Sequence, residues 1–273
     1  MRIAIGIVAF TLLTGTSAFA ADMPMSVPTA AAPIQAVNWT GFYIGGNAGG
    51  VIAHPSGTSD FTDTSLPPGF EFTDNPVAEQ PAKGGFVGGG QAGVNWQFSR
   101  ILVGGLEADW DWMSAKYSFC RQNIGGSNAC NELGVGGGFQ TIDSKTPWLA
   151  TFRGRFGVAW QNWLFYGTGG AAIGRITTDL TMNCPFGCGF LSSTPIFTSS
   201  TSTTTRTGWV AGLGAELMLA RNWTARAEFL YVDLGTISNA LPTVGNSGGI
   251  QTASWSRNET FDEFRLGVSY LFH

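Results

Sequence analysis

Charged residues are scarce in this chain of 273 residues. They make up 12% of the sequence, about half of the roughly 25% typical of a soluble globular domain, whereas hydrophobic residues make up 44%. The 14 Lys and Arg form no cluster and are outnumbered by 18 Asp and Glu, which argues against a nucleic acid as partner. The 20 Phe, 10 Trp and 5 Tyr need burial, which excludes a disordered chain. The composition therefore argues against both an ordinary cytosolic enzyme and a disordered protein.

Long hydrophobic runs are also lacking. The longest uncharged apolar stretch after the N-terminus, residues 156–174, contains five glycines and three polar residues, and it favours two strands around a turn. The apolar run at residues 3–13 is shorter than the ~20 residues that a transmembrane helix needs. No segment of the sequence is therefore expected to cross a membrane as a helix.

The N-terminal run instead predicts a secretory signal peptide. Arg2 precedes it, and an A-x-A sequence ends at Ala20, so we expect cleavage between Ala20 and Ala21. The organisation predicted from these features is a signal peptide at 1–20, a flexible Pro-containing periplasmic leader at 21–37 and a folded domain at 38–273.

Cysteine is rare, and the four cysteines fall in or beside two expected loops of an exported chain. They are Cys120, Cys130, Cys184 and Cys188. Oxidised pairs are the natural interpretation, with 120–130 and 184–188 the local choice among three connectivities. A metal site is the alternative, but no histidine lies near these cysteines.

What the sequence has in abundance is alternation with a period of two. In residues 101–112 the even positions are apolar, whereas the odd positions end in Glu107, Asp109 and Asp111. The same split predicts eight strands, at residues 39–52, 86–98, 101–112, 148–160, 163–176, 208–219, 223–231 and about 263–272.

The connections between these strands alternate in length. Three have the size of hairpin turns, at 99–100, 161–162 and 220–222, and four are long and rich in Gly, Ser, Thr, Asn and Pro, at 54–83, 119–145, 180–204 and 238–258. Short turns at one end and long loops at the other predict an all-β, eight-stranded antiparallel up-and-down transmembrane barrel, with turns in the periplasm and loops outside. A soluble β-sandwich is the alternative, but its outward face would be charged.

Aromatic residues favour the membrane alternative, because they gather near the two ends of the predicted strands like interfacial girdles. Beside the short turns are Trp96, Phe98, Trp160, Trp163, Trp223 and Phe272, and near the long loops are Trp110, Trp112, Trp148 and Trp209.

The opposite face of the strands would line a lumen just wide enough for side chains to fill. Its ten charged residues are Glu107, Asp109, Asp111, Arg153, Arg155, Glu216, Arg226, Glu228, Glu263 and Arg265. Six acids and four arginines in a narrow tube should pair, because an unpaired buried charge is costly, and this favours a structural plug. A narrow diffusion pore is the alternative, since five lumen glycines leave room for water, namely Gly105, Gly157, Gly212, Gly214 and Gly267.

Residues for catalysis are few. The only histidines are His54 and His273, and the sequence contains neither G-x-S-x-G nor H-E-x-x-H. A lipid-modifying barrel enzyme could use His54 as a base beside the polar residues that follow it, Ser56, Ser59, Asp60 and Asp63. Exposed polar loop residues are the commoner explanation, so we expect no enzymatic activity and no cofactor or metal.

Five segments resemble the small outer-membrane β-barrel proteins of alphaproteobacteria, a "porin family" similar in architecture to the OmpA transmembrane domain. They are residues 38–49, 84–98, 164–170, 222–235 and 264–270; the pair WTGFYIGG (39–46) and YVDLG (231–235) is the most specific part. The resemblance implies a surface-exposed outer-membrane protein that the barrel-assembly machinery inserts, with a role in envelope integrity and surface interaction. Its expected partners are outer-membrane lipid, lipopolysaccharide and host or surface ligands of the loops.

Overall fold

The computed structural model describes residues 37–54, 56–63, 75–76, 84–122, 139–184, 196–244 and 250–273. They form ten strands: β1 (Gly41–Ala53), β2 (Ser56–Asp63), β3 (Asn75–Pro76), β4 (Gly84–Gln97), β5 (Leu102–Gln122), β6 (Phe139–Trp160), β7 (Trp163–Cys184), β8 (Ile196–Met218), β9 (Trp223–Val244) and β10 (Ile250–Phe272). No helix in this part of the chain is both long and apolar enough to span a membrane.

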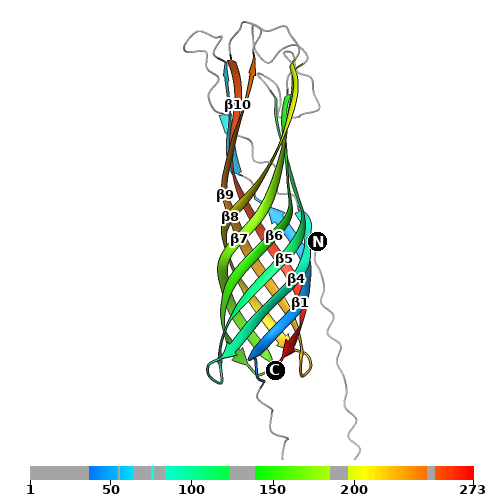
Figure 1. Cartoon of the computed structure of the whole chain (residues 1–273), viewed down its shortest axis with the longest axis vertical. Helices are drawn as coiled ribbons and strands as arrows, with labels where there is room; N and C mark the ends of the chain where they lie inside the picture. Colours follow the sequence, from blue (N-terminus) through cyan, green and yellow to red (C-terminus); the bar gives the residue numbers. More distant parts are fainter. Residues whose placement is uncertain are drawn as a thin grey trace, which may run out of the picture. The chain divides into compact units, whose positions relative to one another are not determined.

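Eight of the strands close into a ring. The order is β1-β4-β5-β6-β7-β8-β9-β10, every neighbouring pair is antiparallel, and β1 returns to β10 from Phe42↔Phe272 to Ala53↔Phe261. The eight-stranded antiparallel barrel predicted from the sequence is thereby confirmed (Figure 1). The short strand β2 pairs with the upper part of β10, and β3 pairs with β2.

The apolar and polar residues that alternate in the sequence point to the outer and inner faces of this ring, respectively. On β5, Trp112 is 65% exposed whereas its neighbour Asp111 is fully buried, and the same inversion recurs around the barrel. Large apolar side chains thus cover the outer surface, and charged side chains fill the interior. A soluble β-sandwich has the opposite arrangement, which excludes that alternative.

Tight connections join the strands at one end, where the polypeptide needs only two to four residues to reverse. Gln161, in the two-residue turn between β6 and β7, has a φ of 53°, which is typical of the turns that match the twist of a hairpin. The turn between β8 and β9 is closed by a bond from the Leu219 amide to the Trp223 carbonyl of 2.9 Å.

At the other end the strands are much longer than the sequence predicted. The described parts of the expected loops at 119–145, 180–204 and 238–258 are strand, because β5, β6, β7, β8, β9 and β10 all continue into them. The long loop at 54–83 likewise contains β2 and β3. These parts of the loop prediction were wrong; the tips at 123–138, 185–195 and 245–249 lie outside the described residues.

Above the closed ring, the sheet divides into two. The last pair between β8 and β9 is Trp209↔Asp233, and the last pair between β4 and β5 is Val87↔Met113. Beyond these points β5, β6, β7 and β8 continue as one sheet, and β9, β10 and β2 continue as another (Figure 1).

A β-bulge marks the point of division. In β9, Leu234 and Gly235 lie opposite the single residue Glu259, and Gly235 adopts a left-handed conformation with φ of 76°. Its amide donates to the Asp233 carboxylate at 2.7 Å. One residue beyond the last pair, a Cβ on Gly208 would lie 1.8 Å from the Asp233 carbonyl oxygen, so the two strands approach there as closely as glycine allows.

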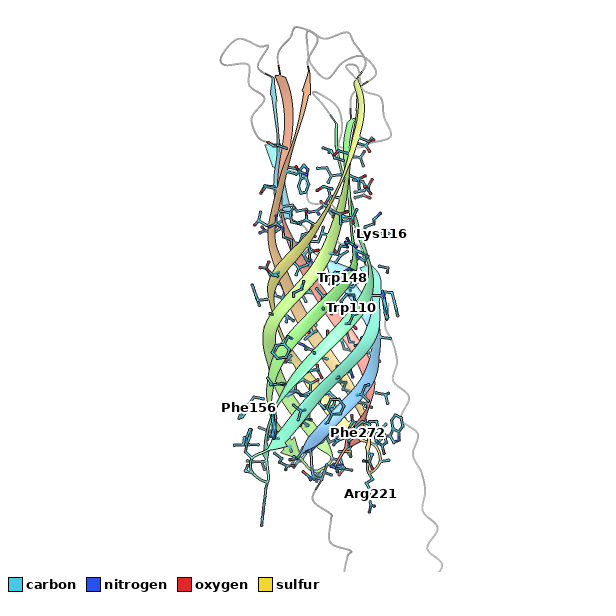
Figure 2. All side chains as sticks on the ribbon, viewed as in Figure 1. Trp110, Lys116, Trp148, Phe156, Arg221 and Phe272 are labelled. Atoms are coloured by element: carbon cyan, nitrogen blue, oxygen red, sulfur yellow. The ribbon has the colours of Figure 1, made fainter. Side chains whose placement is uncertain are left out.

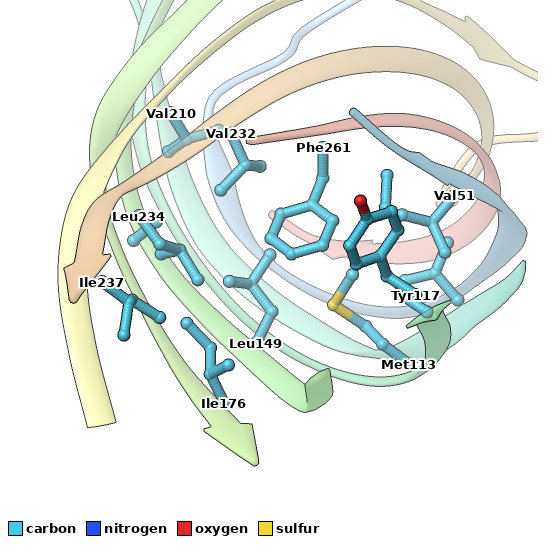
Figure 3. Packing of buried hydrophobic residues seen from close by; sticks show 14 of the residues in the cluster. Val51, Met113, Tyr117, Leu149, Ile176, Val210, Val232, Leu234, Ile237 and Phe261 are labelled. Carbon is cyan, nitrogen blue, oxygen red and sulfur yellow. The ribbon is translucent and has the colours of Figure 1, made fainter. Parts of the chain in front are cut away.

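Inside the ring, two apolar clusters lie on either side of the charged residues. Eight residues beside the short turns form the lower cluster: Trp39, Tyr43, Val103, Ala159, Leu164, Tyr166, Met218 and Leu271. A larger upper cluster of eighteen residues includes Met113, Leu149 and Phe261, which point toward one another across the interior in Figure 3. Along β5, for example, Val103 belongs to the lower cluster, Glu107 follows it, and Met113 belongs to the upper cluster.

Candidate functional site

The barrel interior between the two apolar clusters holds a continuous network of charged side chains. Glu107 is its hub, because β5 directs this carboxylate to the centre of the ring, where it is 2% exposed. One of its oxygens accepts from Arg153 at 2.5 Å, and the other accepts from the Tyr43 hydroxyl at 2.6 Å and from Arg226. Three strands far apart in sequence are thus tied through one side chain.

Two arginines distribute their donors over several carboxylates. Besides Glu107, Arg153 donates to Asp109 at 2.7 Å and to Glu228 at 3.0 Å. Arg265 donates to Glu228 at 2.6 Å, and also to Asp109 and Asp111. Both guanidinium groups are at most 1% exposed, and each faces carboxylates from two or more strands. A buried charge is tolerated under these conditions, where several opposite charges and hydrogen bonds surround it.

A third arginine lies between two tyrosines. Arg155 donates to Glu216 at 2.5 Å and to the Tyr43 hydroxyl at 2.9 Å, and its guanidinium lies 4.0 Å from the centre of the Tyr166 ring. The tyrosines belong to the lower apolar cluster, so this contact joins the network to that cluster. Neither tyrosine was predicted as a lumen residue from the sequence, because on β1 the many glycines obscured the alternation that would have placed Tyr43 inside.

Of the ten charged residues predicted for the lumen, nine form ion pairs with one another. Glu263 is the exception: among the described residues neither of its carboxylate oxygens has a hydrogen-bond partner, although the side chain is fully buried. Its register partners are Val51 and Leu230, both members of the upper apolar cluster. Glu263 thus lies at the boundary of the network, where the facing side chains offer no donor.

The lumen glycines make room for side chains. A Cβ on Gly214 would lie 2.3 Å from the Tyr166 ring, and a Cβ on Gly157 would lie 2.7 Å from the Cβ of the same tyrosine. A Cβ on Gly105 would lie 2.6 Å from the Asn95 side chain, and Gly212 faces Leu230 at the same distance. Around Gly267, the nearest atoms to an added Cβ belong to the Gly46 backbone and to Gln91, at 3.1 and 3.2 Å. The space that these glycines leave is therefore occupied by packed protein atoms.

The aromatic residues predicted as girdles lie on the outer surface near the two ends of the ring. Figure 2 places Trp110 and Trp148 high on the closed barrel and Phe272 near the turns. The indole rings of Trp110 and Trp148 stack with a centroid distance of 4.5 Å, and Trp209 lies 5.3 Å from the Tyr231 ring. Trp148 is half-buried, whereas the others are at least 38% exposed: Trp96, Phe98, Trp110, Trp112, Trp160, Trp163, Trp209, Trp223 and Phe272.

The remaining candidate residues do not assemble into a site. His54 hydrogen-bonds Asp262 at 2.9 Å on the outer surface; Ser56 is exposed, and the side chains of Ser59, Asp60 and Asp63 lie outside the described part. The cysteine pairing also falls outside it, since Cys130 and Cys188 and the side chains of Cys120 and Cys184 are not described. Among the described residues, no three His, Cys, Asp or Glu are placed to hold a metal ion.

Comparison with known protein families gives a match over almost the whole chain. The outer membrane protein beta-barrel domain family matches residues 10–272. This chain belongs to that family. Its interior network and apolar exterior are therefore those of an outer-membrane protein of this family, and the chain resides in the cell outer membrane.

Two relatives in this outer membrane protein family come from alphaproteobacteria. The 31 kDa outer-membrane immunogenic protein of Brucella melitensis is 34% identical over 263 residues, which cover 94% of each chain. The 22 kDa outer membrane protein of Rhizobium leguminosarum bv. viciae is 27% identical over 88% of this chain and 82% of its own. The family resemblance stated from the sequence is thereby confirmed.

Two solved structures of outer-membrane proteins match this chain at low sequence identity. OprG of Pseudomonas aeruginosa is 13% identical, with a TM-score of 0.47 over 87% of this chain and 98% of its own. The protease OmpT of Escherichia coli is 8% identical, with a TM-score of 0.44 over 88% of this chain and all of its own.

Proposed function

We propose that this outer-membrane protein is a sealed barrel with a structural role in the cell envelope, and that it presents its upper strands and loops to the outside. The observation that supports the proposal is the filling of the interior. A network of nine paired charges crosses the lumen, and apolar clusters lie above and below it. An ion crossing this barrel would have to displace both apolar clusters and break several buried ion pairs.

The orientation follows the rule for barrels of this type, in which short turns face the periplasm and long segments face outward. Outer-membrane lipid and lipopolysaccharide would then contact the apolar exterior, and the barrel-assembly machinery would insert it. The name "immunogenic" of the Brucella relative fits a surface that a host meets, so host or surface ligands of the loops belong to the proposal.

The proposal includes no catalytic role. The His54 ring is bound to Asp262 with 47% of its side chain exposed, and among the described residues no serine or threonine hydroxyl donates to that ring. Nucleophilic catalysis requires a nucleophile within hydrogen-bond reach of the base, and the described side chains place none beside the His54 ring.

Single-channel recording tests the sealed interior against the diffusion pore. The folded barrel, verified by different gel migration of boiled and unboiled samples, is inserted into a planar bilayer, and we expect no conductance steps. Replacing Arg153 and Arg155 with Ala should then mainly destabilise the barrel. Stable steps in the unmodified protein, altered in size or selectivity by those substitutions, would establish the pore in place of the plug.

A further inference from the structure

A cavity lies where the two sheets separate above the ring. Its volume is about 210 Å³. Its lining comes from both sheets: Ile176, Thr178, Ser202, Thr204 and Arg206 on one side, and Ile237, Ser238, Asn239 and Trp255 on the other. Such a cavity exists because β8 and β9 stop pairing at Trp209 and Asp233 and leave a lateral gap. It belongs neither to the buried charge network nor to the upper apolar cluster alone.

The level of the cavity places it outside the hydrocarbon region of the membrane. Its β8 residues lie beyond Trp209, which, among the β8 side chains that the structure describes, is the last exposed aromatic one on the side away from the turns. At the same level the outer surface is polar: Lys145 lies 3.8 Å from Asp179 and both side chains are exposed, and Ser118 donates to Asp143. Headgroups and sugars, and not acyl chains, surround the barrel at this height.

The lining carries one positive charge, Arg206, that forms no ion pair among the described residues. The buried Nε of Arg206 has no hydrogen-bond partner among the described residues, and none of the ion pairs in this part of the chain involves Arg206. No acidic residue lines the cavity. An arginine in this setting is suited to a carboxylate or a phosphate, which its planar guanidinium binds through two parallel hydrogen bonds.

The rest of the lining is suited to a sugar ring. Thr178, Ser202 and Thr204 supply hydroxyl groups and Asn239 supplies an amide, all of which can both donate and accept. Trp255 supplies an apolar aromatic side chain. The volume is below the roughly 300–1,000 Å³ of pockets for drug-sized ligands, so one sugar unit is the size that fits.

A hydrogen-bonded chain supports the floor of the cavity. The Thr178 hydroxyl lies 3.4 Å from that of Ser144, and Arg257 donates to Ser144 at 2.7 Å. Arg257 is 6% exposed and pairs with Glu259, while its guanidinium lies 5.2 Å from the Tyr117 ring and 5.5 Å from the Trp255 ring. Two lining residues, Thr178 and Trp255, are thus held in place before any ligand arrives.

We propose that the cavity between β7–β8 and β9–β10 binds one acidic sugar unit, carboxylated or phosphorylated, with Arg206 as the partner of its anionic group. Such a unit occurs both in the core of lipopolysaccharide and in free glycans, and the gap beside Trp209 gives lateral access to either. This proposal goes beyond the structural role above and does not depend on whether the lumen conducts, because the cavity lies above the buried network.

Calorimetric titration of the folded, full-length protein in detergent tests this assignment. The probes are glucuronate, glucose 6-phosphate, neutral glucose and inorganic phosphate. We expect both acidic sugars to bind at least about tenfold more tightly than glucose, because an arginine–anion hydrogen bond contributes about that much. Inorganic phosphate should also bind more weakly than glucose 6-phosphate, because it lacks the sugar ring that would contact Trp255 and the hydroxyl groups.

Two variants distinguish binding in this cavity from nonspecific attraction of an anion to arginine side chains. Arg206→Gln should weaken glucose 6-phosphate binding at least about tenfold, whereas Arg175→Gln, at an exposed arginine paired in register with Thr205 of the same sheet, should leave it unchanged. Both variants must show the heat-dependent gel migration of a folded barrel. Equal binding of glucose or of inorganic phosphate, no binding of any probe, or an unchanged affinity in Arg206→Gln would each overturn the proposal.

Vesicles distinguish the two sources of the sugar. The labelled protein is titrated with vesicles that contain lipopolysaccharide with an acidic core, and separately with vesicles that contain lipid A alone. Preferential, Arg206-dependent binding of the core-bearing vesicles would assign the site to lipopolysaccharide. Binding of the free acidic sugars without that preference would assign it to a soluble glycan; both results support the acidic-sugar site.

Discussion

The closed ring and the divided extension above it consist largely of the same strands, but the strands differ in how many hydrogen-bonded neighbours they have in the two regions. In the ring every strand has two hydrogen-bonded neighbours. Above Trp209↔Asp233, β8 pairs only with β7, and β9 pairs only with β10. Unpaired backbone groups are very costly in hydrocarbon but are satisfied by water outside it. The ring is therefore closed where the exterior is apolar, and the sheet opens where the exterior becomes polar.

The interiors of the two regions also differ, because the buried arginines of the ring have more polar partners than those of the extension. In the ring, each arginine faces two or more polar partners, and nine charges are joined in one network. In the extension, Arg257 has one carboxylate partner, Glu259, and Arg206 lines a cavity. Stability in the ring should thus depend on many coupled buried charges, whereas the extension depends on the single pair Arg257–Glu259.

The largest effect is expected from Arg153→Ala. It would leave Glu107, Asp109 and Glu228 without one of their donors in a fully buried setting, and breaking a buried ion pair in this way costs about 3–5 kcal/mol. Arg175→Ala removes an exposed arginine from the neighbouring strand and should change the free energy of unfolding by less than about 0.5 kcal/mol. Urea unfolding in lipid vesicles, followed by tryptophan fluorescence, measures both. Similar losses for the two variants would contradict the difference between interior and exterior.

A smaller effect is expected from Gly214→Ala. Its Cβ would lie 2.3 Å from the Tyr166 ring, and overpacking of this kind typically costs about 1–3 kcal/mol. Gly169→Ala is the matched control, because its Cβ would lie 3.6 Å from the nearest atom, an ordinary contact. Adding Tyr166→Leu to Gly214→Ala should recover part of the loss in the same urea experiment. A Gly214→Ala barrel as stable as the control would mean that the interior is loosely filled, as a pore requires.

The sequence predicted the ring better than the extension for a physical reason. Strands in lipid carry large apolar side chains at every second position, so β5 and β10 are recognisable from Leu106 or Phe264 and their neighbours. Above the membrane no apolar face is needed. The Ser and Thr residues at 199–205 therefore resemble a loop in sequence, although they belong to β8, which is an edge strand at this level. Threonine is a good strand former, but this preference alone is a weak signal.

Within the candidate site, the ten lumen residues could be identified from their charge and from their position in the alternating pattern. Their uncharged partners could not. Tyr43 lies on a strand where glycines obscure the alternation, and Gln91, which binds Arg226, is an ordinary polar residue in sequence. The cavity near Arg206 was not predicted at all. It arises from the division between β8 and β9, at which Gly208 and the bulge at Gly235 lie.

The smallest effect concerns how the stability of the extension depends on pH. Burial raises the pKa of Glu259 above its ordinary value, although Arg257 opposes this shift. As the pH falls through the raised pKa toward the ordinary one, the folded extension takes up a proton that the unfolded chain does not, which stabilises the fold; this stability is lost as the pH rises again. Amide hydrogen exchange, corrected for its intrinsic pH dependence, should therefore show severalfold greater protection of β9 and β10 near Glu259 at pH 5 than at pH 8.

Glu259→Gln should remove this pH dependence, because the amide does not titrate. Asp179→Asn changes an exposed carboxylate of the same extension, on β7, and should leave the dependence as it is. Amides of the closed ring on β5 and β6 provide an internal reference within each sample, since their protection reports the ring and not the extension. If protection of ring and extension changed together with pH, the two regions would unfold as one unit, and the division at Trp209 and Asp233 would have no energetic counterpart.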